Sequence, residues 1–249
     1  MQPPHPPLGP YYTSERERSA WVRGIFDRTA ADYDRIERIL GLGTGSWYRR
    51  QALRDAGLRP GMIVIDVGTG TGLLARAAAA IVGDPARVTG VDPSAGMIEH
   101  AKVPAGVRLL AGSAEAIPAP DNSADFLTLG YALRHVSDLG AAFTEFYRVL
   151  RPGGLVCLLE ITLPEGRVSR ALLKAWLKGF VPKLATVVAH ERDTPLLMRY
   201  YWDTIAACVP PGAILAALAA AGFIEAERNT DLAIFSAYRA RKPGAGSSL

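Results

Sequence analysis

Apolar and polar positions follow two rhythms along the chain, and the change between them predicts the order of its elements. From Ser14 to Gly57 apolar residues recur at steps of three and four, as on one face of a helix. From Met62 to Ile161 short apolar runs alternate with helical stretches. Such alternation indicates right-handed βαβ crossovers and a parallel sheet with helices on both faces. The predicted strands are 62–67, 88–92, 107–111, 125–129 and 155–161, and the predicted helices are 71–82, 94–102 and 139–150.

The rest of the chain predicts one domain with additions. A mostly helical insertion covers 165–208, and a helix at 211–221 precedes two segments that we expect to form a closing two-stranded hairpin. The proline-rich opening MQPPHPPLGP predicts disorder, and the PGAGSSL ending predicts flexibility. The predicted boundaries are a disordered tail at 1–12, a single domain at 13–240 with a helical cap at 13–58, and a flexible tail at 241–249.

Composition and charge narrow the class of protein. A length of 249 residues with 49% hydrophobic residues fits one large α/β domain with a sizeable core. The net charge of +4 comes without a basic and aromatic block, so we expect no nucleic-acid partner. Cys157 and Cys208 lie in apolar stretches, no cluster of His, Cys or Asp has metal-ligand spacing, and no signal peptide opens the chain. We therefore expect a cytoplasmic protein without a metal ion.

A glycine-rich loop follows the first predicted strand. In VIDVGTGTG, Asp66 ends the strand and three alternate glycines follow, at Gly68, Gly70 and Gly72. Glycine is needed where a backbone turns tightly and a ligand must touch it without a Cβ in the way. The second strand ends in Asp92, and a carboxylate at that position can accept both hydroxyls of a ribose. The pattern predicts a cofactor that contains a nucleoside.

The spacing of the loop selects among nucleoside cofactors. A nicotinamide dinucleotide fold favours G-x-G-x-x-G, whose third glycine would fall at position 73, where this chain has Leu73. A carboxylate two residues before the first glycine would repel a pyrophosphate and attract an ammonium group. The D-x-G-x-G-x-G pattern therefore indicates S-adenosylmethionine. Two alternatives remain at this level: a glycine-rich turn without a ligand, and an Asp92 that only caps a helix or pairs with a cation, although Ser94 could serve as that cap.

Six further stretches make the chain resemble a known family. They are FDRTAADYDRI, VIDVGTGTG, GVDPSAGMI, GSAEAIPAPDNSADFLTLGYALRHVSD, FYRVLRPGGLVCLLEIT and AGF, and they are similar to the ubiquinone/menaquinone-biosynthesis C-methyltransferase family over roughly 24–240. The resemblance implies a Rossmann-like class I methyltransferase, with a mostly parallel seven-stranded sheet and an antiparallel last strand. It also implies methyl transfer from S-adenosylmethionine to a ring carbon of a quinol or phenol. The chain departs from the family at His135 and Ser113, and its segment between Leu163 and Val209 matches weakly.

The resemblance and the chemistry of the loop together assign a cofactor site. Asp66 is expected to face the methionyl amine, with the carbonyl of Gly130, and Asp92 to take the ribose. Met97 would pack near the adenine, and Ser113 and Ala114 would meet its edge. The full set of expected cofactor contacts is Asp66, Gly68, Thr69, Gly70, Gly72, Asp92, Pro93, Met97, Ser113, Ala114, Glu115 and Gly130.

Three residues are candidates for the chemistry. Ionising a phenol of pKa about 10 at neutral pH costs about 4 kcal/mol, which a neighbouring cation and a base can offset. We expect Arg134 to stabilise the phenolate, His135 to accept the proton directly or through water, and Tyr33 to face the same cavity. The structural alternatives are that Arg134 holds its loop through Asp138 or a backbone carbonyl, and that His135 and Tyr33 only pack.

The helical insertion at 165–208 bears on which acceptor molecule the protein binds. Val168, Leu172, Trp176 and Phe180 recur every four residues, with basic residues on nearly the opposite face. Such a helix either packs its apolar face on the core or forms a lid over an acceptor tunnel, with a basic face that could meet a membrane through residues 168–183. We expect a small aromatic acceptor, which could be prenylated. A natural-product phenol methylated on oxygen, nitrogen or carbon, a cofactor-binding protein without catalysis, a homodimer and a position at the inner membrane all remain open.

Overall fold

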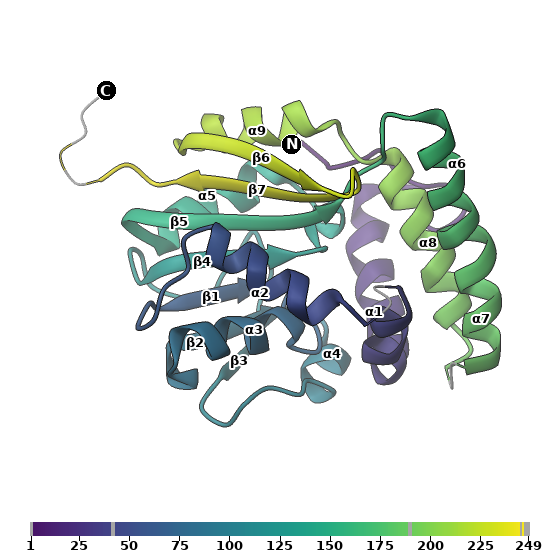
Figure 1. The fold of residues 1–249 in the computed structure, drawn as a ribbon, viewed down its shortest axis with the longest axis horizontal. Coiled ribbons are helices and arrows are strands. Elements are labelled where there is room, and N and C mark those ends of the chain that lie inside the picture. The colour runs from purple at the N-terminus through teal and green to yellow at the C-terminus, as the bar shows by residue number, and fades with distance from the viewer. Residues whose placement is uncertain (1, 41–42, 189–190, 245, 247–249) are drawn as a thin grey trace.

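A seven-stranded sheet in the order β3-β2-β1-β4-β5-β7-β6 runs through the middle of the protein (Figure 1). The computed structural model describes residues 2–40, 43–188, 191–244 and 246. Strand β7 runs antiparallel to β5 and β6, and the pairs from β3 to β5 are parallel, which confirms the predicted architecture. The strands are β1 (Val64–Val67), β2 (Val88–Asp92), β3 (Arg108–Ala111), β4 (Ala124–Gly130), β5 (Leu150–Ile161), β6 (Ile224–Asp231) and β7 (Phe235–Arg241).

Helices surround the sheet and extend beyond the carboxyl ends of its parallel strands (Figure 1). Among the described residues, no single helix is long and apolar enough to cross a membrane. Helices α8 (Thr194–Ala207) and α9 (Pro211–Ala220) pass that test of length and composition only as a pair, and they are bent by 75° relative to each other. The helices are α1 (Glu15–Leu40), α2 (Gly45–Asp55), α3 (Leu73–Val82), α4 (Ala95–Glu99), α5 (Leu139–Val149), α6 (Arg167–Lys174), α7 (Val181–Val188), α8 (Thr194–Ala207) and α9 (Pro211–Ala220), with short 3₁₀ turns η1 (Pro85–Arg87) and η2 (Leu133–His135) and a π-helical turn η3 (Ala175–Phe180).

The two faces of the sheet are covered by different helices because side chains alternate along each strand. In β5, Val156 and Leu158 pack with α5 and α9, whereas Cys157 and Leu159 pack with α2 and α3. All of these side chains are buried, as are both faces of β1. The buried strands β1, β2, β4 and β5 therefore have nearly continuous apolar runs, which explains why the sequence predicts their core, whereas β3 and β6 are largely exposed.

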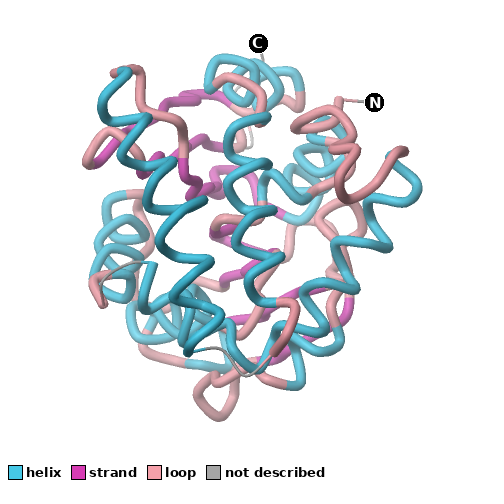
Figure 2. The backbone as a smooth tube through the Cα atoms, turned by 90° about the vertical axis from the view of Figure 1, so that its right-hand side faces the viewer, coloured by secondary structure: helices cyan, strands magenta, loops and turns pink. Residues whose placement is uncertain are grey.

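A third layer lies across the carboxyl ends of the parallel strands. Helices α1, α7 and α8 form a separate apolar cluster there, which includes Ile25, Leu197 and Tyr200. Figure 1 shows α1, α6, α7 and α8 on one side of the sheet, and Figure 2, turned toward that side, shows these helices in front of the strands. The ends of the strands are thus enclosed rather than open to solvent, and ligands in open α/β sheets bind at that edge.

The first residues contradict the predicted disorder at 1–12, because residues 2–12 pack against the domain. His5 is 1% exposed and Tyr12 is 3% exposed. The Leu139 amide donates to the Gln2 carbonyl at 2.9 Å, and the Val209 amide donates to the Pro4 carbonyl at 2.7 Å. Proline lacks an amide donor but keeps its carbonyl, so a proline-rich segment can still accept such bonds.

The predicted flexible tail at 241–249 is also wrong at its start. Arg241 belongs to β7, and Lys242 is 8% exposed. The Lys242 ammonium donates to the carbonyls of Tyr147 and Leu150, both at 2.7 Å. These contacts fix the end of β7 to the sheet. Residues 245 and 247–249 lie outside the described residues.

The packing of the first residues makes a testable prediction about stability. We expect Tyr12→Ala to lower the free energy of unfolding by about 3 kcal/mol or more, because it removes a buried ring that contacts Trp21 and Tyr200. Urea denaturation followed by circular dichroism measures the change. Gly9→Ala is the matched control, since a Cβ at Gly9 would meet no atom within 4 Å. Equal stability of the Tyr12→Ala and wild-type proteins would mean that the segment does not contribute to the fold.

Candidate active site

The glycine loop leaves β1 in a conformation that suits glycine. Gly68, Gly70 and Gly72 have φ values of +62°, +55° and +84°, in the left-handed region. A Cβ on Gly68 would lie 2.8 Å from the Cβ of Ala132, in the loop after β4. A Cβ on Gly70 would meet only the Met97 sulfur, at 4.0 Å. Gly68 is therefore required by packing, and Gly70 lies beside space that a ligand can occupy.

Asp66 is the buried carboxylate of this loop. It is fully buried, and its Oδ2 accepts a hydrogen bond of 2.7 Å from the Thr69 hydroxyl. Its Oδ1 is buried without a hydrogen-bond partner. Burial raises the pKa of Asp66 to about 7, and the nearby charge of Asp92 adds to the rise. An unpartnered buried carboxylate oxygen is costly, and an ammonium group would offset that cost.

Asp92 lies at the end of β2 and organises the turn that follows. Its Oδ2 accepts from the Gly70 amide at 2.7 Å, and its Oδ1 accepts from the Ser94 amide at 2.9 Å. Ser94 caps α4 by accepting from the Met97 amide, so Asp92 is not the helix cap. Burial raises the pKa of Asp92 to about 6. Each carboxylate oxygen has a second lone pair, which leaves capacity for ribose hydroxyls.

Helix α1 closes over these loops through two carboxylates that the sequence analysis did not single out. Asp27 accepts from the Ser94 hydroxyl at 2.6 Å and from the Gly96 amide at 3.0 Å. Asp34 accepts from the hydroxyl of Thr71 in the glycine loop. A Cβ on Gly96 would lie 2.8 Å from the Asp27 carbonyl oxygen, so the backbones approach closely. Both aspartates belong to the FDRTAADYD stretch, which was the only sequence signal.

The remaining expected cofactor contacts lie at the same carboxyl ends of the strands. Met97 and Ala114 are buried, and Pro93 is exposed beside Asp92. Ser113 pairs with Ala116 in an isolated bridge after β3, and Gly130 ends β4. The Glu115 carboxylate accepts from the Ser137 amide at 2.6 Å. Glu115 thus joins the loops after β3 and β4, a structural contact that its place in the sequence did not indicate.

A cavity of about 440 Å³ lies between the edge of the sheet and the helical layer. It is lined mainly by apolar side chains from α1, α2, α8, the α6–η3 region and the β6–β7 hairpin. The α2 residues that line it run from Gly45 to Asp55, a span of about 15 Å along a helix. The cavity is therefore elongated, with room for a ring and an apolar side chain.

One end of the cavity is polar, because Arg134, Tyr33 and Tyr201 line it together. Arg134 is 2% exposed and forms an ion pair with Glu160 at the end of β5. Its Nε donates to the Thr204 hydroxyl at 3.1 Å, and its guanidinium carbon lies 5.0 Å from the centre of the Tyr201 ring. The side chains of Tyr33 and Tyr201 are hydrogen-bonded, and burial raises the pKa of each above its usual range. Both tyrosines are therefore neutral at pH 7, and because one hydroxyl donates to the other, one hydroxyl proton of the pair is left for a ligand.

The contacts of Arg134 differ from both structural alternatives. Its side chain pairs with Glu160, a residue that the sequence analysis missed, whereas Asp138 accepts from the Gly140 and Ala141 amides at the start of α5. Glu160 Oε2 is buried without a hydrogen-bond partner. Burial raises the pKa of Glu160, although the Arg134 charge opposes that rise. The pair places one cation on the cavity wall and its counter-ion behind it.

His135 lies behind the wall, among the aromatic rings of Phe26, Tyr200 and Tyr201. It is not one of the residues that line the cavity. Its Nδ1 is 3.3 Å from the Tyr200 hydroxyl, and its Nε2 is buried without a partner. Burial lowers the pKa of His135 well below its usual value, and the Arg134 charge lowers it further. The imidazole is therefore neutral at pH 7.

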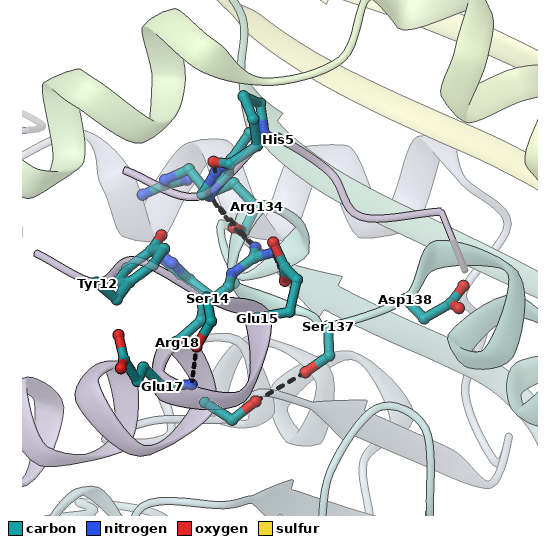
Figure 3. A network of polar contacts seen from close by, with 12 residues as sticks. His5, Tyr12, Ser14, Glu15, Glu17, Arg18, Arg134, Ser137 and Asp138 are labelled. Carbon is teal, nitrogen blue, oxygen red and sulfur yellow. Dashed lines mark hydrogen bonds and ion pairs between the residues drawn. The ribbon is translucent and has the colours of Figure 1, made fainter. Parts of the chain in front are cut away.

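The loop that carries Arg134 is fixed from outside by the first residues of the chain, as Figure 3 shows. The Arg134 carbonyl accepts from Arg18 Nη2 at 2.7 Å and lies 3.1 Å from His5 Nε2. The Ser19 and Ser137 hydroxyls are 3.0 Å apart. Arg18 is fully buried, so its charge is held close to this carbonyl. Residues 5 to 19 thus position the loop from the side opposite to the cavity.

Tyr131 is strained at the tip of β4. It has φ of +59°, a left-handed conformation that costs a bulky residue about 1–3 kcal/mol. Its amide donates to the Leu159 carbonyl at 2.7 Å, and its side chain lines the cavity. No pattern in the sequence pointed to this residue, because a positive φ at a tyrosine depends on the strands beside it. Strain of this kind is concentrated at functional sites.

Solved structures with a similar fold include methyltransferases. An S-adenosylmethionine-dependent methyltransferase from Thermotoga maritima is 22% identical, with a TM-score of 0.61 over 88% of this chain and 98% of that chain. Another from Aquifex aeolicus is 18% identical, with a TM-score of 0.59 over 84% of this chain and 97% of that chain. At these identities the likeness shows the fold alone.

Sequence relatives are more specific. The ubiquinone/menaquinone biosynthesis C-methyltransferase UbiE of Shewanella halifaxensis is 32% identical over 192 residues, which cover 74% of this chain and 76% of the relative. The model of the ubiE/COQ5 methyltransferase family matches residues 13–237, which include the glycine loop, the Arg134 loop and the helical layer. This match accounts for both the glycine loop and the enclosed carboxyl ends of the strands: the chain belongs to the ubiE/COQ5 methyltransferase family, and it is a methyltransferase of the class I fold.

Proposed function

We propose that this methyltransferase transfers a methyl group from S-adenosylmethionine to a ring carbon of a quinol or phenol that carries an apolar side chain. The observation that carries the proposal is the elongated cavity, with Arg134, Tyr33 and Tyr201 together in its lining and mainly apolar side chains along the rest, beside the polar side chains of Glu37, Gln51, Asp55, Asp231 and Arg239. An ionised ring hydroxyl fits the polar end, and an alkyl or prenyl chain fits the apolar part. The Shewanella relative is a ubiquinone/menaquinone biosynthesis C-methyltransferase by name, which supports the same acceptor class.

The residues of the glycine loop suit the cofactor. Asp66 would hold the methionyl amine, since its Oδ1 is buried and unpartnered, and Asp92 would accept from the ribose hydroxyls. Gly70 leaves room for close approach, and Met97 lies beside it. When bound, S-adenosylmethionine supplies an electrophilic methyl group whose sulfur keeps the electron pair of the broken bond, while the acceptor carbon gains the methyl and loses its hydrogen as a proton.

The polar end of the cavity would promote this reaction by stabilising charge. Loss of the hydroxyl proton places negative charge on oxygen and raises electron density at the ortho carbon. The Arg134 guanidinium is a fixed donor that can face this oxygen without reorganising. One hydroxyl of the Tyr33 and Tyr201 pair is a second such donor, since the other hydroxyl proton is used in the hydrogen bond between the two tyrosines. Glu160 and Thr204 hold the guanidinium in one orientation. We assign the hydroxyl proton to His135, which would accept it through a water molecule because it lies behind the cavity wall, and its Nε2 has no hydrogen-bond partner.

An acceptor assay tests the proposal. The purified protein is incubated with methyl-labelled S-adenosylmethionine and with demethylated quinols of short and long side chain, plain phenols, and phenols whose ortho positions are blocked. We expect methyl on carbon, and faster turnover with the longer side chain, because the cavity is elongated. Mass spectrometry identifies the product and its methyl position. Methyl on oxygen, or turnover limited to phenols without a side chain, would refute the proposed acceptor.

The raised pKa of Asp66 predicts how cofactor affinity depends on pH. The ammonium of the ligand needs an ionised carboxylate, and in the free protein Asp66 is protonated below about pH 7. We therefore expect the Kd for S-adenosylmethionine to be about tenfold higher at pH 6 than at pH 8, as measured by calorimetry. Asp66→Asn should bind weakly at both values and lose this dependence. Asp121 lies in the loop before β4, at the amino ends of the strands, and Asp121→Asn should retain the pH dependence of the Kd. A wild-type Kd that does not change with pH would contradict the role of Asp66.

Two substitutions test the chemistry of the wall. Arg134→Lys keeps a positive charge but loses the planar fork, and we expect kcat to fall about 10²–10³-fold. His135→Asn keeps a similar shape but removes the base, and kcat should fall about 10²–10⁴-fold. Cofactor Kd and thermal unfolding serve as controls for folding. Full turnover in either variant would exclude that side chain from the proposed mechanism.

A further inference from the structure

Five large apolar side chains are exposed on the part of the protein that surrounds the cavity. They are Trp47 at 64% exposure, Val168 at 73%, Leu172 at 67%, Phe180 at 52% and Leu232 at 83%. They come from α2, from α6 and η3, and from the hairpin between β6 and β7. We call these five residues the rim. Exposed apolar side chains that gather in one region indicate a docking surface.

Each member of the rim is connected to the cavity. Trp47 and Leu232 line it themselves. Leu172 precedes the lining residue Leu173, and Val168 lies one helical turn before Leu172. The Phe180 ring stacks on Trp176, another lining residue, with centres 5.1 Å apart. Figure 1 shows the β6–β7 hairpin reaching toward α6 and α8. Two members of the rim therefore belong to the cavity lining, and the other three lie on the α6–η3 segment that contributes Leu173, Trp176 and Leu177 to it.

The exposed part of α6 differs from an ordinary amphipathic helix. The sequence allowed the face of Val168, Leu172, Trp176 and Phe180 to pack on the core, but three of these four side chains are exposed. The packed side is formed by Leu177, which is buried, and by the partly buried Leu173 and Trp176. That interpretation is wrong, because the helix contacts the domain through a neighbouring face. Its other apolar face is left to solvent.

The charge around the rim has one sign on α6, η3 and the first turn of α7. Residues 167–183 contain five basic residues and no acidic residue. Arg167 and Lys174 are exposed, and Lys178 is exposed in part while it pairs with Asp203 at 3.3 Å. Apolar side chains flanked by lysine and arginine suit the interface of a bilayer that contains anionic lipids.

We propose that the rim docks on the surface of an anionic lipid bilayer, with Trp47, Val168, Leu172, Phe180 and Leu232 entering the headgroup region and Arg167 and Lys174 meeting lipid phosphates. The opening of the cavity then faces the bilayer, so an apolar acceptor can enter without crossing water. A second copy of the chain fits this surface less well, since a twofold interface would bring the same basic residues face to face.

Vesicle co-sedimentation of the full chain, without acceptor or cofactor, tests the proposal. Vesicles of phosphatidylcholine mixed with phosphatidylglycerol should bind the wild-type protein, and vesicles of phosphatidylcholine alone should bind it much less. Each basic residue near an anionic surface contributes about fivefold to partitioning. Arg167→Glu with Lys174→Glu should therefore lower binding at least 25-fold, and Val168→Ser with Leu172→Ser should also lower it.

The matched control reverses the same amount of charge elsewhere. Arg16→Glu with Arg23→Glu changes two exposed arginines on the first half of α1, which contributes no residue to the cavity, and should bind like the wild type. Turnover of a water-soluble acceptor should be unchanged in the rim variants, which separates docking from the proposed function. Equal binding of the rim variants, or no binding by the wild type, would overturn the proposal. A wild-type dimer that Val168→Ser with Leu172→Ser dissociates would assign the rim to a second copy instead.

Discussion

The buried ion pair between Arg134 and Glu160 joins two strand ends of the sheet to the helical layer. Arg134 comes from the loop after β4 and Glu160 from the end of β5, and each side chain is 2% exposed. Removing one partner of such a pair typically costs about 3–5 kcal/mol, because the other charge stays buried and uncompensated. The pair therefore fixes the two strand ends relative to each other. Thr204 of α8 bonds to the same guanidinium, so the helical layer is fixed to the sheet at this point.

The cofactor half and the acceptor half of the site are organised by different means. In the cofactor half, backbone amides and short hydroxyl side chains satisfy carboxylates, as in the contacts of Asp92 with Gly70 and Ser94. In the acceptor half, donors lie against an apolar wall, with Arg134 beside Tyr201. Helix α1 connects the halves, because Asp27 and Asp34 reach the cofactor loops while Tyr33 faces the cavity. Closure over one ligand would thus also shape the site of the other.

A feature could be predicted from the sequence when it depends on residues close together in the chain, and could not when it depends on contacts between distant residues. Strand positions and the glycine loop depend on local pattern, and β2 and β1 were predicted to within two residues. Asp66 and Asp92, the two carboxylates proposed to hold the cofactor, lie at adjacent strand ends, because β1 and β2 pair in parallel. Asp27, Glu160 and Tyr201 could not be found in this way, since each meets its partner across a long separation in sequence. The order of residues 2–12 was missed for the same reason: their partners, such as the Val209 amide, are distant in the chain.

The sequence by itself determined the order of strands and helices, the glycine loop and the family, because each of these depends on residues close together in the chain or on a motif. Tertiary structure alone decided that Arg134 pairs with Glu160, that His135 is buried behind the cavity wall, and that Val168 and Leu172 are exposed. Pairing and burial depend on which surfaces meet when the layers pack. A periodic pattern shows that a helix has an apolar face, but only the packed molecule shows whether that face is covered.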